Sequence, residues 1–115
     1  MATSIIKAMN TIAMDSGSQS VASGTITKMA DMPVPDTDAY YLVTLHARPD
    51  QTNASKFIKA RLSNVFVTKS VMQNGVDVEC VGIVRGNGAT VQFAVDHDYG
   101  SAVTVTWDYK IVKLT

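Results

Sequence analysis

The residues of this chain best suited to chemistry are the run Asp96-His97-Asp98 and the isolated histidine His46. Two carboxylates around an imidazole supply ligands for a metal ion or groups for acid–base catalysis. Neighbouring residues rarely converge on one ion without further ligands, and Tyr99-Gly100-Ser101 continues the run as a turn. We therefore interpret Asp96-His97-Asp98 as a solvated turn and predict no metal site and no bound cofactor.

His46 and Cys80 both stand among apolar residues. His46 lies within the apolar run 39–47, where a hydrogen-bonded core or interface histidine is expected rather than a ligand. Cys80, the single cysteine, alternates with Val76 and Val78 and has no basic neighbour in sequence that would lower its thiol pKa. We interpret Cys80 as a small core residue.

No catalytic signature occurs in the sequence. There is no Ser-His-Asp order, paired-histidine spacing or CxxC, and Gly86-Asn87-Gly88 is too short to cradle a phosphate and is typical of a turn. Ten basic residues balance ten acidic ones, so the basic excess of a nucleic-acid-binding protein is missing. The sequence therefore predicts a protein that is not an enzyme and does not bind nucleic acid.

The composition predicts a soluble protein that is made in the cytoplasm and associates with other copies. No stretch approaches the roughly 18 apolar residues of a membrane span, and residues 1–7 lack the features of a secretion signal. Hydrophobic residues make up 46% of the chain and charged residues 17%, with a net charge of +0, so little repulsion keeps copies apart.

The elements that position these residues follow most clearly from the last quarter of the chain. Apolar residues alternate with polar ones over residues 89–95 and again over 103–111, which predicts two half-buried strands joined by the turn 96–101. Further extended segments are expected at 21–29, 39–47, 58–62, 65–67 and 76–84, with a proline-containing loop at 31–38. A helix over 56–69 is a weaker alternative because β-branched residues recur there.

These segments predict one all-β domain, an antiparallel β-sandwich of a jelly-roll-like kind with seven or eight strands. We expect this domain to span residues 19–115 and an N-terminal arm to span residues 1–18. The polar run 15–20 is expected to be flexible. The arm's apolar side chains are expected to pair as an edge strand or to anchor the protein on a neighbour or a capsid; they are Ile5, Ile6, Met9 and Ile12.

The run 39–47 is apolar on both faces of the predicted strand, although a strand of a single sandwich needs only one apolar face. Tyr41, Val43 and Leu45 occupy one face. The second face predicts a subunit contact formed by Tyr40, Leu42, Thr44 and His46.

The order of features over residues 39–115 resembles the jelly-roll module of the tumour-necrosis-factor and complement-C1q class and its phage counterparts. The resemblance rests on the aromatic-rich strand 39–47, on the run Gly82-Ile83-Val84-Arg85 leading into a glycine turn and residues 89–93, and on the final strand 107–114. It implies a homotrimer packed around aromatic and aliphatic residues of one sheet. Because the sequence has no secretion signal, collagen stalk or cysteine pair, it is most similar to the module as found in tailed-phage virion proteins.

Two functions follow from this resemblance. The first is a trimeric decoration or cement protein on the outer surface of a tailed-phage capsid, assembled in the host cytoplasm with the major capsid protein or other virion proteins as partners; it is favoured by a one-domain chain that starts at Met1. The alternative is a receptor-binding tip of a tail fibre, with a host-surface glycan as its partner. The exposed loop residues that would bind this glycan are Arg85, Asn87, Asp96, His97 and Tyr99.

Overall fold

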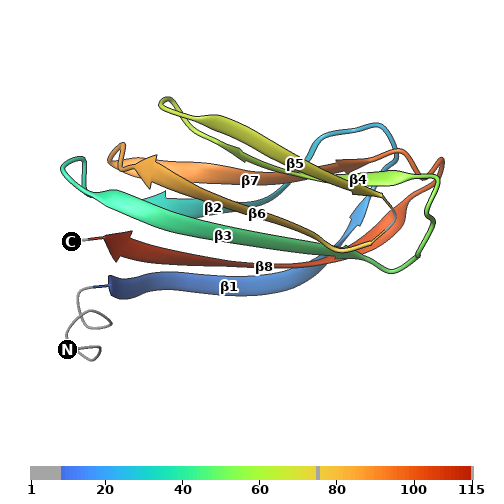
Figure 1. The fold of residues 1–115 in the computed structure, drawn as a ribbon, viewed down its shortest axis with the longest axis horizontal. Coiled ribbons are helices and arrows are strands. Elements are labelled where there is room, and N and C mark those ends of the chain that lie inside the picture. Colours follow the sequence, from blue (N-terminus) through green and yellow to red (C-terminus); the bar gives the residue numbers. More distant parts are fainter. Residues whose placement is uncertain (1–8, 75, 115) are drawn as a thin grey trace.

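The computed structural model describes residues 9–74 and 76–114. These residues fold into eight strands along the long axis of the molecule (Figure 1). In chain order the strands are β1 Met9–Val21, β2 Thr27–Val34, β3 Tyr40–Pro49, β4 Phe57–Ser63, β5 Thr68–Asn74, β6 Val78–Arg85, β7 Ala89–His97 and β8 Val103–Leu114. None of the described residues belongs to a helix that is long and apolar enough to cross a membrane.

The strands form two four-stranded antiparallel sheets, ordered β1-β8-β3-β6 and β2-β7-β4-β5. The pairs β1·β8, β2·β7, β3·β6 and β4·β5 alternate between the two sheets, as in one long hairpin folded over on itself. This is the strand order of a jelly roll, in which two Greek keys share two packed sheets. The predicted all-β antiparallel sandwich with seven or eight strands is confirmed.

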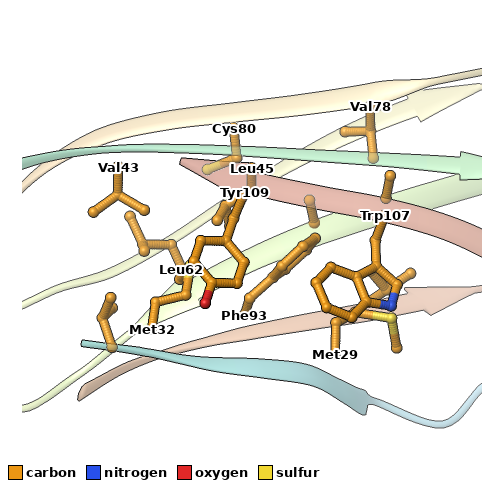
Figure 2. Packing of buried hydrophobic residues seen from close by; sticks show 14 of the residues in the cluster. Met29, Met32, Val43, Leu45, Leu62, Val78, Cys80, Phe93, Trp107 and Tyr109 are labelled. Carbon is orange, nitrogen blue, oxygen red and sulfur yellow. The ribbon is translucent and has the colours of Figure 1, made fainter. Parts of the chain in front are cut away.

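The core lies between the sheets and follows the predicted alternation. On β8 the inward side chains are buried and the outward threonines, Asp108 and Lys110 are exposed. The aromatic side chains meet in the middle of the sandwich (Figure 2): the Phe93 ring stands edge-on to Trp107 at 6.0 Å between centroids, and Trp107 stacks on Tyr109 at 6.2 Å. Cys80 is fully buried in this core, as predicted, and burial raises the pKa of its thiol.

The structure places residues 9–18 in β1, at the edge of a sheet, so the expected edge-strand pairing is confirmed for these residues, and they belong to the sandwich that was expected to begin at residue 19. β1 pairs with β8 from Met9 opposite Leu114 to Val21 opposite Val103, so the polar run expected to be flexible is a paired strand. Its residue types suit this position because Gly17 lies directly under Trp107, where an added Cβ would come within 2.8 Å of the indole. Ile5 and Ile6 lie outside the described residues.

The structure also differs from the expected strand at 21–29 and the expected loop at 31–38. Val21 ends β1, a turn containing Gly24 with a φ of 77° follows, and β2 then runs to Val34 through Pro33. Proline is tolerated there because β2 lies at the edge of its sheet. The helical alternative over 56–69 is wrong, since that segment forms β4, the turn after it and the start of β5.

Candidate functional site

The sheet β1-β8-β3-β6 packs one face on the core and turns the other outward. On β3, Tyr41, Val43 and Leu45 are buried in the core. The side chains between them therefore lie on the outer face, which is the face predicted to form the subunit contact: Tyr40, Leu42, Thr44 and His46.

The strand register brings more apolar residues beside Tyr40 and Leu42. Leu42 is opposite Ile83 on β6 and Val112 on β8, Tyr40 is opposite Leu114, and Thr44 is opposite Val81. Tyr40 and Ile83 are more than half exposed, at 55% and 62%, and Val81 is 40% exposed. We call this set the outer apolar patch; it consists of Tyr40, Leu42, Val81, Ile83, Val112 and Leu114.

An arginine and a further aromatic ring extend the outer apolar patch at its β6 end. Arg85 lies opposite Tyr40, and its guanidinium carbon is 5.4 Å from the centroid of the Phe66 ring. Phe66 itself is exposed, in the turn between β4 and β5. Tyrosine and arginine side chains of this kind contribute strongly to protein interfaces.

The other end of the outer face is polar. His46 lies between two carboxylates, with Nε2 3.2 Å from Asp77 Oδ2 and Nδ1 3.2 Å from Asp108 Oδ2. Arg48 donates from Nε to both oxygens of Asp77 at 3.0 Å and from Nη2 to Oδ2 at 2.9 Å. The hydrogen bonds from Arg48, followed by that from His46, hold the pKa of Asp77 below its ordinary value. These contacts tie β3 to β8 and to the segment before β6.

An open groove of ≈ 530 Å³ lies over β1, β8 and β3. Its lining residues are Met14, Asp15, Ser16, Thr44, Asp108, Tyr109 and Lys110. The groove includes one acidic and one basic side chain from the outer face of β8 beside the thioether of Met14. Among the described residues, no group of three or more His, Cys, Asp or Glu side chains is arranged to hold a metal ion.

The turn predicted to be solvated is instead built into the structure. His97 is fully buried, with Nε2 2.7 Å from the carbonyl oxygen of Val21 and Nδ1 accepting the main-chain N–H of Tyr99 at 3.2 Å. Asp96 accepts a hydrogen bond from Arg61 Nε at 2.8 Å, and Asp98 accepts the N–H of Phe57 at 2.7 Å.

The five residues expected to form a glycan-binding surface are not brought together. Arg85 and Asn87 adjoin the turn between β6 and β7, whereas Asp96, His97 and Tyr99 lie at the opposite end of β7. At about 3.3 Å per residue, the strand between these groups spans tens of ångströms. His97 was expected in an exposed loop; this is wrong, because its two ring nitrogens hydrogen-bond in the interior.

The predicted anchoring residues divide between described and undescribed parts of the chain. Met9 begins β1, and Ile12 sits at an irregularity in the β1–β8 register between Thr11 and Ala13, where its side chain is exposed. Both are thus part of the edge of the sheet.

Sequence reasoning missed four members of the outer apolar patch: Val81, Ile83, Val112 and Leu114. A signal was present for the first two: Cys80 and Val84 flank them at the positions that face the core, so the intervening Val81 and Ile83 must face outward. The sequence of β6 is thus apolar on both faces, like that of β3.

No family model and no curated protein matches the chain. The comparison with solved structures gives several similar chains, among them the following three. A chain of the Bacillus endospore appendages, described as a family of disulfide-linked pili, is 12% identical with a TM-score of 0.53, over 90% of this chain and 88% of that one. FLHE is 13% identical with a TM-score of 0.47, over 92% and 96%. A family two carbohydrate esterase from Cellvibrio japonicus is 13% identical with a TM-score of 0.28, over 88% of this chain and 35% of that one.

At 12% sequence identity, the similarity to the endospore appendage chain concerns the fold alone. The all-β sandwich of this chain is thus similar to the fold of a chain of the Bacillus endospore appendages.

Proposed function

We propose that this chain is a non-enzymatic structural protein that associates with copies of itself through the outer apolar patch, as a homotrimer that decorates or cements the outer surface of a tailed-phage capsid. The observation that carries the proposal is the patch itself: six aliphatic and aromatic side chains gathered on the outward face of a sheet. Contiguous exposed apolar surface of this kind marks sites of protein contact.

The energetics favour association through this face. Burying each large aliphatic side chain contributes about 1.5–3 kcal/mol, and the neutral chain adds little repulsion between copies. Trimeric state, capsid location and the major capsid protein as partner rest on the resemblance of residues 39–115 to jelly-roll modules of virion proteins. In this proposal the mature protein resides in the virion after assembly in the host cytoplasm.

A structural rather than catalytic role is supported by what the titratable residues do. Asp96, His97 and Asp98 each hold a neighbouring strand or turn in place. His46 is occupied by two carboxylates on an exposed surface.

The association is tested with two isoleucines of similar exposure. Ile83, in the outer apolar patch, is 62% exposed, and Ile26, before β2, is 58% exposed. Ile83→Asp is expected to abolish the trimer, because burying an unpaired charge costs several kcal/mol. Ile26→Asp is the matched control and should remain a trimer. Light scattering of both variants decides the question; a monomeric wild type at micromolar concentration, or equal behaviour of the two variants, contradicts the proposal.

The capsid role is tested separately by co-sedimentation with undecorated capsids. The wild-type protein should sediment with them and Ile83→Asp should bind several-fold less. A glycan array screened with the same preparation provides the alternative outcome: strong glycan binding without capsid binding would favour the fibre tip.

A further inference from the structure

The four edge strands of this sandwich are not equally protected against pairing with another strand. β2 carries Lys28, Pro33 and a register irregularity, and β5 is only seven residues long. On β6, the carbonyl of Val81 accepts a hydrogen bond from Lys69 Nζ. Short length, lysine, proline and bulges are the features that block edge pairing in native proteins.

β1 lacks most of these features. It is the longest strand, at 13 residues, contains no lysine, arginine or proline, and carries a single charged residue, Asp15. Its one irregularity lies between Thr11 and Ala13, which leaves residues 13–21 as a regular strand with one side paired to β8 and no described residue paired to the other side. An unprotected edge of this length is a template for a further antiparallel strand.

The sequence of residues 13–21, Ala-Met-Asp-Ser-Gly-Ser-Gln-Ser-Val, is complementary to itself when reversed about Gly17. Antiparallel pairing with a second copy about that glycine sets Asp15 opposite Gln19, so that each carboxylate meets an amide. It also sets Ser16 opposite Ser18, Met14 opposite Ser20 and Ala13 opposite Val21. At the two-fold axis the two Gly17 residues face each other, so no side chains collide there. A register centred on Asp15 would instead bring two carboxylates together.

We propose that two copies of this chain pair antiparallel along the free edge of β1, about a two-fold axis at Gly17, so that the β1-β8-β3-β6 sheets of the two sandwiches become one continuous sheet. A two-fold axis perpendicular to the sheet places the core-facing residues of both copies on the same side, so each copy keeps its second sheet. This contact uses the edge of the sheet, whereas the proposed function uses its outer face, and the two contacts are independent.

Cysteine cross-linking tests the edge and its register together. In the proposed register Ser16 of one copy faces Ser18 of the other, at a Cα separation that a disulfide spans. An equimolar mixture of Ser16→Cys and Ser18→Cys should therefore form covalent dimers under mild oxidation, whereas either variant alone should not. Cys80 is buried and stays out of the reaction. No dimer from the mixture, or as much dimer from one variant alone, would overturn the proposal.

Two substitutions of one residue provide a second readout. Gln19→Lys places an ammonium opposite Asp15 at both ends of the pairing and should raise the dimer fraction, while Gln19→Asp places a carboxylate there and should lower it. Each dimer contains the contact twice, so we expect changes in the dimerisation constant of about threefold to tenfold in opposite directions, measured by sedimentation. Changes in the same direction would overturn the register. The cross-link should persist in Ile83→Asp, so a failure of the outer-face contact and a failure of the edge contact are distinguishable.

Discussion

His97 is the one polar side chain that the core buries completely among the described residues. Its ring nitrogens have different partners: Nε2 faces the Val21 carbonyl, and Nδ1 accepts the N–H of Tyr99. This assignment requires the neutral tautomer with its proton on Nε2. The histidine thus joins the end of β1 to the turn between β7 and β8, and its function is architectural.

Replacing His97 with alanine should lower the free energy of unfolding markedly. The change leaves the buried carbonyl of Val21 without its partner, at about 1–3 kcal/mol, leaves the partly buried N–H of Tyr99 without its acceptor, and opens a cavity. Urea unfolding measures the loss. His46→Ala is the matched control, because the only other histidine of the chain is partly exposed and its ion pairs contribute at most about 1 kcal/mol. Equal losses for the two variants would contradict the architectural role of His97.

At the scale of elements, the predictability of a strand depends on how its two faces differ. β7 and β8 alternate apolar and polar residues, so their positions and their buried faces follow from the sequence alone. β1 and β5 carry small or polar residues on most positions, and they are strands because a neighbouring strand supplies the hydrogen bonds. The residue pattern within β1 or β5 does not show that such a neighbouring strand exists.

The same reasoning applies to the outer apolar patch. Tyr40 and Leu42 were found because β3 is apolar on both faces. Ile83 and Val112 join them only through the strand register, and register depends on which strands lie side by side.

Trp107→Ala tests whether β8 organises the core. Trp107 contacts Phe93, Tyr109 and the backbone at Gly17, so its truncation removes aromatic contacts from both sheets. We expect a loss of about 3–5 kcal/mol in the free energy of unfolding. Thr104→Ala, on the exposed face of the same strand, should change it by less than about 0.5 kcal/mol. A small effect of the tryptophan substitution would show that the core repacks around its absence.

The turn between β6 and β7 depends on a close approach of two backbones. A Cβ added at Gly86 would lie 1.9 Å from the carbonyl oxygen of Asp36, a distance that no side chain rearrangement relieves. Gly86→Ala should therefore yield insoluble or unfolded protein. Gly24→Ala has open space around the new methyl group and only its positive φ to oppose it, so it should fold with a loss of about 1 kcal/mol. Circular dichroism of the two variants compares them, and a folded Gly86→Ala protein would contradict this account.

On the scale of the whole molecule, ion pairs connect segments that are far apart in sequence. Asp77 pairs with Arg48, and Asp36 pairs with Lys113 at 3.0 Å. The pKa of Asp36 is lowered by the N–H of Asp38 and then by Lys113, and the pKa of Asp77 is lowered by Arg48. Each carboxylate stabilises the fold in its charged form.

We expect this contribution to be present above the ordinary carboxyl pKa of 3.8 and to be lost as the pH falls below it, through the lowered pKa values of the folded state. Asp77→Asn should cost about 0.2–1 kcal/mol at pH 7, as is usual for an exposed pair. At pH 2–3 (roughly one unit or more below the ordinary value) the difference from wild type should shrink. Urea unfolding at both pH values measures it, and a difference that grows in acid would contradict the assignment.

The pairing of β1 with β8 also determines how the folded molecule responds to mechanical load. Met9 lies opposite Leu114, so the first and last described strands end side by side at one end of the sandwich (Figure 1). A pulling force applied through these two points would open the ladder from that end, breaking its hydrogen bonds one after another instead of loading them together. The sandwich should therefore unfold at low force when it is pulled apart through Met9 and Leu114. Tension carried through the flat faces or edges of the sheets would not unzip this ladder.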